Sequence, residues 1–293
     1  MPTTTSTHSA AASSVRTFLL VHGSGSSSHS WAPLERELAL RGQRTYAVDL
    51  PGHGFDACLP AGYDAPQDPH ALATAPSTLA GVTLDDNVDV VLTAAERLAA
   101  HGPVVLVCAS LGGVTATVAA NRRPELFAGL VYVSAWVCVS RSNPLELMAE
   151  PEFATSSLPQ LGGLAVGDPA VIGAARANYR TADPDLLADL QAATAHDISR
   201  DAFTAFRNIM EPDESLAVMA ADARIDPDTW GQLPRTYVRL GADRSIPPAL
   251  QDRMIREADE ATPGNAFRVH TLDSSHIGFL FQPATVADLL LDA

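Results

Sequence analysis

The sequence contains no lysine: all 19 basic residues among its 293 are arginines. Without lysine, the chain cannot form a Schiff base with a substrate or use an amine as a general base. It also cannot hold a nucleotide phosphate with a Walker-type lysine. We attribute the exclusive use of arginine to the codon bias of a high-GC genome. The lack of lysine therefore excludes these reaction types but does not indicate a function.

Cysteine and long apolar runs are also scarce. The three cysteines, Cys58, Cys108 and Cys138, are odd in number and lack metal-site spacing, so we expect reduced thiols in a cytoplasmic protein. No apolar run is long enough to span a membrane. Residues 1–14 have no charged start, and the run Phe18–Val21 is too short for a signal peptide. We therefore expect a disordered tail over residues 1–14.

Positive charge is outweighed by negative charge. The formal net charge is −15 at pH 7, which argues against nucleic acid or an anionic membrane surface as a partner. With 46% hydrophobic residues, the chain can build a substantial packed core. We expect an acidic globular enzyme whose partner is a small hydrophobic substrate, with no metal and no cofactor.

Apolar runs alternate along the chain with helical patterns. The runs predict buried strands at Thr17–Val21, Arg44–Leu50, Val104–Cys108, Leu126–Val133, Arg235–Leu240 and Phe267–Leu272. Strands that are apolar throughout and alternate with helices indicate a mostly parallel, doubly wound sheet covered on both faces. The predicted fold class is therefore α/β. A helical pattern over Gln282–Leu291 closes the chain.

Two helices carry start signals, and one segment carries none. Ser30 can cap a helix whose apolar residues include Leu34 and Leu38. The segment Thr83–Asp86 resembles a capping box, with aspartate in place of glutamate. Residues 55–79 are rich in proline, alanine and aspartate without periodicity, so we expect a loop there.

The regular alternation stops after Val133. Residues 136–233 are typical of short helices broken by proline and glycine. Helical patterns are expected over residues 144–147, 170–179, 184–195 and 201–209. We predict that residues 136–233 form a helical cap inserted into a core made of residues 15–135 and 234–293.

A short turn at Ser110 holds the strongest functional signal. The strand run ends in Cys108-Ala109, the serine follows, and Leu111-Gly112-Gly113 leads into a helix of small residues. A serine on a strained strand-to-helix turn, flanked by small residues, is the nucleophile elbow pattern. Because a serine hydroxyl is a weak nucleophile, it needs an imidazole base and a carboxylate that fixes the imidazole tautomer.

Asp243 and His276 are the predicted partners of Ser110. Each follows a predicted strand, and the chain order of serine, acid and histidine is the one this architecture uses. Taken alone, Asp243 could begin a turn, and His276 could be an ordinary loop histidine. Three post-strand loops in this order are much more specific than a serine near a glycine. We therefore predict Ser110, Asp243 and His276 as the catalytic residues.

The loop His22-Gly23-Ser24-Gly25, after the first strand, supplies a fourth component. The tetrahedral intermediate of acyl transfer is stabilised by backbone N–H donors, and we predict the N–H groups of Ser24 and Leu111 as this oxyanion hole. A nucleotide-binding role does not fit, because the loop lacks a third glycine and the chain lacks a Walker lysine.

These motifs resemble those of α/β-hydrolases. The resemblance is carried by Phe18–Gly23, Asp49–Gly54, the elbow, Asp243–Pro248 and Ser275-His276. It is greatest for the branch of plant methylesterases, hydroxynitrile lyases and their bacterial esterase relatives. It covers nearly the whole chain and is weakest over residues 55–79 and through the cap. The resemblance implies an α/β-hydrolase fold with Ser110, Asp243 and His276 as its triad.

That branch offers two chemistries. Its lyases carry a threonine after the first-loop histidine and a lysine after the catalytic histidine. Here these positions are Gly23 and Ile277, which resemble the esterases, so cyanohydrin cleavage by the lyase mechanism does not fit. We predict a carboxylesterase that cleaves a hydrophobic small-molecule ester or lactone, with Gly23, Trp136 and Ile277 as substrate-binding residues.

The elbow departs from its relatives at Cys108-Ala109, where glycine and a polar residue, often histidine, are usual. We expect Cys108 to be a buried filler behind Ser110 and Ala109 to widen the pocket. Two alternatives stay open. The same triad could serve a non-hydrolytic cyclisation, elimination or rearrangement in secondary metabolism, or the protein could be a small-molecule receptor. Retention of all three triad residues argues against a receptor.

Overall fold

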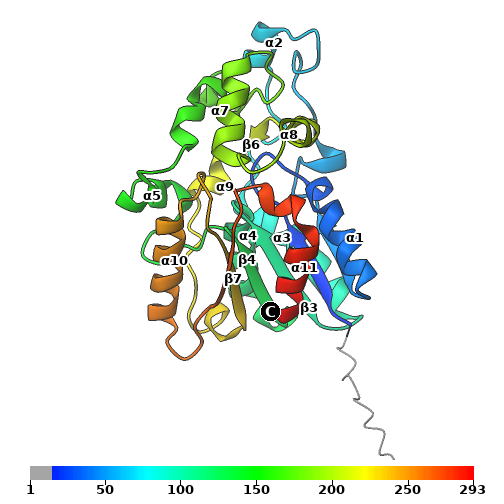
Figure 1. The fold of residues 1–293 in the computed structure, drawn as a ribbon, viewed down its shortest axis with the longest axis vertical. Coiled ribbons are helices and arrows are strands. Elements are labelled where there is room, and N and C mark those ends of the chain that lie inside the picture. Colours follow the sequence, from blue (N-terminus) through cyan, green and yellow to red (C-terminus); the bar gives the residue numbers. More distant parts are fainter. Residues whose placement is uncertain (1–14) are drawn as a thin grey trace, which may run out of the picture.

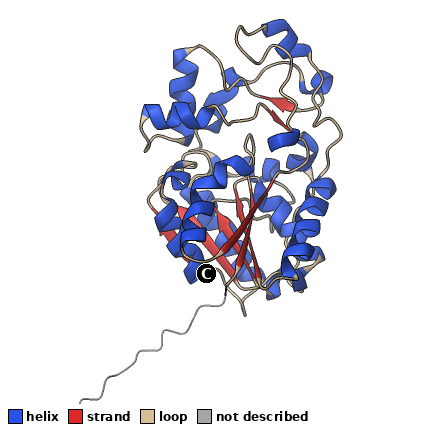
Figure 2. Ribbon diagram, turned by 90° about the vertical axis from the view of Figure 1, so that its right-hand side faces the viewer, coloured by secondary structure: helices blue, strands red, loops and turns tan. Residues whose placement is uncertain are grey.

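The computed structural model describes residues 15–293, which form two layers (Figure 1). The lower layer is a sheet with helices on both faces. The upper layer contains short helices and a two-stranded sheet, and it lies beyond the carboxyl ends of the lower strands (Figure 2). The predicted tail, residues 1–14, lies outside the described residues. Among the helices of residues 15–293, none has both the length and the apolar character of a membrane span.

The lower sheet has six parallel strands in the order β2-β1-β3-β4-β7-β8. The strands are β1 (Thr17–Val21), β2 (Arg44–Val48), β3 (Val104–Ala109), β4 (Gly129–Val133), β7 (Arg235–Leu240) and β8 (Arg268–Leu272). This confirms the predicted α/β class. The strand order reverses between β1 and β3. In open α/β sheets, ligands bind at the carboxyl ends of the strands beside such a switch point.

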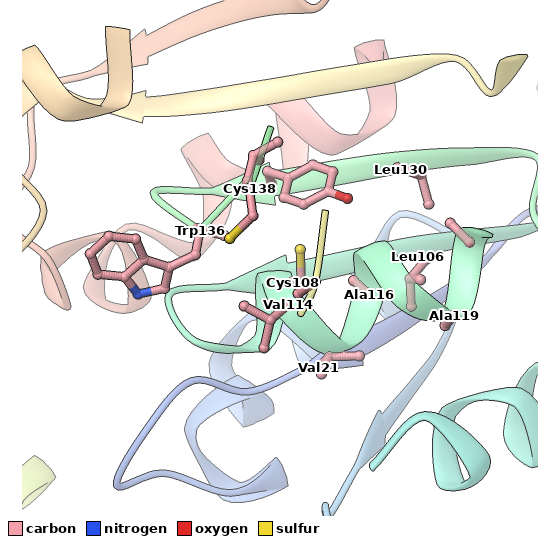
Figure 3. Close-up of a cluster of buried hydrophobic side chains, with 14 of the residues drawn as sticks. Val21, Leu106, Cys108, Val114, Ala116, Ala119, Leu130, Trp136 and Cys138 are labelled. Atoms are coloured by element: carbon pink, nitrogen blue, oxygen red, sulfur yellow. The ribbon is translucent and has the colours of Figure 1, made fainter. Parts of the chain in front are cut away.

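Alternate side chains of the central strands enter two separate cores. Phe18 and Leu20 of β1 point to one face, and Leu19 and Val21 point to the other. Figure 3 shows part of the second core, in which Val21 packs near β3 and the helix that follows it. The covering helices are α1 (Ala32–Leu40) and α11 (Pro283–Asp292) on the first face, and α3 (Leu84–Ala99), α4 (Gly112–Arg122) and α10 (Pro248–Ala261) on the second. Both faces are therefore apolar, as continuous apolar strands require.

The two predicted helix starts have different outcomes. The capping box before α3 is confirmed: the Thr83 hydroxyl accepts the Asp86 N–H at 3.3 Å, and the Asp86 carboxylate accepts the Thr83 N–H at 2.8 Å. The Ser30 cap is wrong. Ser30 lies in a 3₁₀ helix before α1, and its hydroxyl donates to the Ser27 carbonyl at 2.8 Å. The N-cap residue of α1 is Trp31, and no side-chain hydrogen bond caps this helix.

The upper layer is mostly the chain between β4 and β7. Its regular elements are α5 (Pro144–Met148), α6 (Pro169–Ile172), α7 (Pro184–Thr194), α8 (Arg200–Arg207), α9 (Leu216–Ala220), β5 (Ala175–Arg176) and β6 (Asp213–Glu214). The helix predicted over residues 170–179 ends early, because Gly173 takes a left-handed φ of 82°. The chain then turns, and β5 pairs antiparallel with β6.

Residues 55–79 are not a simple loop. They contain α2 (Pro69–Thr74), whose first N–H groups are capped by the Asp68 carboxylate at 3.0 Å. An N-cap aspartate followed by proline is a start signal that our prediction of a loop overlooked. The segment packs on the upper layer, where the Ser77 N–H donates to the Ile172 carbonyl at 2.8 Å. Short 3₁₀ helices at Ser28–Trp31, Gly54–Asp56, Pro124–Leu126, Pro151–Phe153, Leu158–Leu164, Trp230–Gln232 and Gly278–Phe281 complete the described chain.

Candidate active site

Ser110 occupies a sharp turn between β3 and α4. Its backbone φ is 51°, a left-handed conformation that residues other than glycine rarely adopt. A Cβ atom on Gly112 would lie 2.5 Å from the His22 carbonyl oxygen, so only glycine lets α4 begin this close to the end of β1. The strand–turn–helix geometry expected of a nucleophile elbow is therefore present at Ser110.

Ser110, His276 and Asp243 form one hydrogen-bonded chain. Nε2 of His276 lies 3.0 Å from Oγ of Ser110, and Nδ1 of His276 lies 2.7 Å from Oδ2 of Asp243. A carboxylate oxygen accepts, so Nδ1 carries the proton and Nε2 faces the serine hydroxyl as an acceptor. The structure thus brings the three residues together in the relative positions of a nucleophile, a base and an orienting acid.

The Asp243 carboxylate is buried and held by four donors. Oδ2 also accepts the Ser134 hydroxyl at 2.6 Å, and Oδ1 accepts the N–H groups of Ser245 at 2.6 Å and Ile246 at 2.9 Å. These bonds use the carboxylate's acceptor positions and fix its plane toward His276. Ser134 was not predicted. Its signal in the sequence was its place directly after a strand run, at the same sheet edge as Ser110.

His22 anchors the loop that follows β1. Its ring is buried, its Nδ1–H donates to the Gly23 carbonyl at 2.9 Å, and its Nε2 accepts the Leu50 N–H at 3.2 Å. Burial lowers the pKa of His22 to about 3, so the ring is neutral near pH 7. The neutral ring ties the loop containing Ser24 to the end of β2. Within residues 15–293, no backbone hydrogen bond uses the N–H of Ser24 or Leu111, which leaves both predicted donors available.

A cavity of about 70 Å³ opens beside Ser110. One wall is the polar loop from His22 to Ser26, together with the His276 ring. The rest of the lining is mostly apolar and includes Trp31, Ala109, Val133, Phe206, Met210, Ile277, Phe279 and Leu280. Only a few polar groups therefore face this space, which is typical of small-molecule sites.

The three predicted substrate-binding residues lie in two places. Gly23 and Ile277 line the cavity. Trp136, labelled in Figure 3, does not, because its indole is buried in the second core. It packs there against the ring of Phe153. Phe206 of the upper layer lines the cavity and was not predicted. Its contact depends on how the upper layer folds back over the sheet, which residue spacing does not encode.

Of the two residues before Ser110, Cys108 lies in the core and Ala109 lines the cavity. Cys108 is buried in the core behind the turn (Figure 3), and its thiol donates to the Val131 carbonyl at 3.5 Å. Burial raises the pKa of the Cys108 thiol well above its ordinary value, which disfavours the reactive thiolate. Ala109 lines the cavity, and its methyl group leaves space there that a larger side chain would occupy.

A second polar cluster lies behind the His22 loop. The rings of His22 and His53 are 4.9 Å apart, and the Glu211 carboxylate accepts the Gly54 N–H at 2.9 Å. Burial raises the pKa of Glu211. Neither this cluster nor any other group of histidine, cysteine, aspartate and glutamate in residues 15–293 is arranged to hold a metal ion.

The sequence is similar to one protein family and to several plant enzymes. A family model described as the alpha/beta hydrolase family matches residues 18–289. Methylesterase 18 of Arabidopsis thaliana is 25% identical over 285 residues, which cover 94% of this chain and 96% of that protein. Methylesterase 17 of the same plant is 23% identical over 283 residues, covering 94% of this chain and 90% of that protein.

Solved structures show the same architecture. The crystal structure of polyneuridine aldehyde esterase matches with a TM-score of 0.72 and 20% identity, covering 95% of this chain and 98% of that one. A pyrethroid hydrolase from Sphingobium faniae JZ-2 matches with a TM-score of 0.69 and 22% identity, covering 95% of this chain and 96% of that one. At these identities the structural likeness shows a shared fold.

Proposed function

Because this chain belongs to the alpha/beta hydrolase family, we propose that it is a serine carboxylesterase that cleaves a small hydrophobic ester or lactone through an acyl-enzyme. The methylesterases among its relatives support an esterase-type reaction. The observation that carries the proposal is the His276 ring, which bridges Ser110 at 3.0 Å and Asp243 at 2.7 Å.

In the first half of the proposed reaction, Oγ of Ser110 attacks the ester carbonyl while Nε2 of His276 takes the serine proton. The C–O bond to the alcohol then breaks, and His276 returns that proton to the departing alkoxide. In the second half, His276 takes a proton from water, the resulting hydroxide attacks the acyl-enzyme, and Ser110 leaves with its proton restored. Asp243 keeps His276 in the Nδ1–H tautomer and stabilises the imidazolium.

Negative charge develops on the substrate's carbonyl oxygen in both halves. We assign the N–H groups of Ser24 and Leu111 to stabilise it, since the described structure leaves both without a backbone acceptor. The Leu111 N–H is at the start of α4, where the helix dipole also favours negative charge. The buried, neutral His22 holds the Ser24 side of this hole in place.

The cavity sets the size of the substrate group next to Ser110. Its volume is about 70 Å³, and most of its lining is apolar. We infer that this space takes a short apolar acyl or alkyl group, packed against Trp31 and Phe279. Esters with a long chain on that side are expected to be poor substrates.

We further propose that the upper layer acts as a cap, with residues 136–233 as its main part. Phe206 and Met210, which belong to this layer, line the cavity beside Ser110. A substrate in the cavity would therefore contact both layers and be shielded from water. Shielding strengthens the electrostatic interactions on which acyl transfer depends.

Active-site labelling tests the proposed function. A fluorophosphonate probe is expected to modify Ser110 stoichiometrically, and short aryl esters are expected to be hydrolysed. The Ser110→Ala variant should lose labelling and about 10⁴-fold or more of the hydrolysis rate, because removing the nucleophile removes the covalent pathway. Ser157→Ala, which changes a serine outside the cavity, is the matched control and should label normally. A folded wild-type protein that remains unlabelled at Ser110 would refute the proposal.

A further inference from the structure

The connection between α7 and α8, residues 195–199, is hydrogen-bonded to the loop that carries His276. Oδ2 of Asp197 accepts the N–H of Ser275 at 2.8 Å, and Oδ1 accepts the hydroxyl of the same serine. Ser275 is fully buried and directly precedes His276 in the chain. A carboxylate of the upper layer thus binds the residue that directly precedes His276 in the chain.

The same carboxylate also lies against Gly278, two residues after His276 in the chain. A Cβ atom placed on Gly278 would lie 2.5 Å and 2.6 Å from the two Asp197 carboxylate oxygens, so this position is a glycine that makes room for the carboxylate. The Gly278 N–H donates to the Ser275 hydroxyl oxygen at 3.2 Å. Asp197 therefore contacts the chain at residues before and after His276, namely Ser275 and Gly278.

The end of α7 adds two more bonds to the loops of the site. The Thr194 carbonyl accepts the N–H of Ile277 at 3.0 Å, and the Ala193 carbonyl accepts the hydroxyl of Ser245 at 3.1 Å. Ser245 is the residue whose N–H donates to the Asp243 carboxylate. One short stretch of the upper layer thus contacts both the histidine loop and the acid loop.

We propose that Asp197 is a positioning residue, whose carboxylate fixes the loop that aims His276 at Ser110. This inference rests on the proposed function, since the aim of His276 matters only if it acts as the base. Asp197 does not line the cavity, so its loss should slow the chemical step and leave substrate binding unchanged. A displacement of about 1 Å in a reacting group can cost about 100-fold in rate.

The carboxylate is needed because it accepts at both oxygens. Asparagine has one acceptor oxygen and one donor group, so Asp197→Asn can keep the bond from the Ser275 N–H but loses the acceptor for the Ser275 hydroxyl. Asp197→Ala loses both bonds and leaves an empty space against Gly278. The asparagine variant is therefore the conservative one, with an effect between those of wild type and alanine.

Titration with the fluorophosphonate probe distinguishes a misaligned His276 from a misfolded protein. The end point of labelling counts correctly folded sites, whereas the rate constant of labelling reports how well His276 activates Ser110. The variants are Asp197→Asn and Asp197→Ala. Asp189→Asn is the matched control, because Asp189 is exposed on α7 and makes no side-chain hydrogen bond within the described chain. Steady-state hydrolysis of a short aryl ester provides kcat and KM per labelled site.

We expect a full end point for all three variants. The labelling rate constant and kcat should fall about 10- to 100-fold in Asp197→Ala and less in Asp197→Asn, with KM unchanged, while Asp189→Asn matches wild type. A reduced end point with an unchanged rate constant in both Asp197 variants would show a purely structural role and overturn the inference. Wild-type rate constants at a full end point would also overturn it. A wild-type protein that never labels at Ser110 would refute the proposed function itself.

Discussion

Two serines at the sheet edge, Ser110 and Ser134, have positive φ angles of 51° and 38°. Such conformations cost about 1–3 kcal/mol each in non-glycine residues, so the surrounding structure must hold them. Ser110 is held between β3 and α4, and the Ser134 hydroxyl donates to Asp243 at 2.6 Å. Both strained residues therefore lie at the proposed site. At each, the left-handed backbone directs the hydroxyl group toward its partner, and a relaxed backbone would direct it elsewhere.

His22 makes stability depend on pH. Its pKa is lowered to about 3 by burial, whereas an exposed histidine has a pKa of about 6.5. Between these values the unfolded chain binds a proton at His22 that the native chain does not bind, so the free energy of unfolding falls as pH falls. The loss from this one group between pH 7 and pH 5 is about 2 kcal/mol.

The His22→Gln variant tests this dependence through urea denaturation at pH 7 and pH 5. The variant should be less stable than wild type at pH 7, because it loses the bonds to Gly23 and Leu50, but it should lose less stability on acidification. His101→Gln removes an exposed imidazole and serves as the control. An equal fall with pH in wild type and His22→Gln would contradict the assignment.

At the scale of elements, local signals decided where several helices begin. Thr83 caps α3 and Asp68 caps α2, each through a side-chain oxygen that accepts a backbone N–H. These signals lie within four residues and can be read from sequence. The end of α6 at Gly173 and the pairing of β5 with β6 depend on contacts across the upper layer, and there our prediction of one long helix was wrong.

The cap of α3 provides a quantitative test. Thr83→Ala should lower the free energy of unfolding by about 1 kcal/mol, because it leaves the Asp86 N–H without its side-chain acceptor. Thr83→Ser keeps the hydroxyl and should stay close to wild type. Urea denaturation of the three proteins measures the difference. Equal stability of the alanine and serine variants would show that the hydroxyl contributes nothing to α3.

At the scale of the whole molecule, the upper layer is assembled from two distant parts of the chain. Arg176 is buried, and its guanidinium donates to both carboxylate oxygens of Asp213 at 2.6 and 2.7 Å. It also donates to the carbonyls of Leu72 and Ala75 at 2.7 and 2.8 Å. One arginine thus joins the segment before α3 to the chain after β4, and the segment we expected to be a loop is part of this layer.

Removal of Arg176 should loosen that assembly. Arg176→Met leaves the Asp213 carboxylate buried without its partner, which typically costs about 3–5 kcal/mol. We expect faster proteolysis within residues 55–79 and a lower free energy of unfolding. Adding Asp213→Leu should recover part of the loss, because the double variant buries no unpaired charge. A single variant as protease-resistant as wild type would refute the role of Arg176 as the link.

The sequence by itself determined the sheet, the elbow and the order of Ser110, Asp243 and His276. Each of these depends on patterns a few residues long: apolar runs, small residues around a serine, and polar residues directly after strands. The parallel sheet then brings the ends of its strands to one edge, so residues far apart in sequence become neighbours.

Only the tertiary structure decided which side chains face Ser110 and what holds them. Trp136 points into the core rather than the cavity, while Phe206 reaches the cavity and Asp197 reaches the loop of His276. The contacts of Phe206 and Asp197 form where one layer packs on the other, and Asp197 and Ser275 are 78 positions apart in the chain. They depend on the shape and relative placement of both layers, which no local pattern of residues encodes.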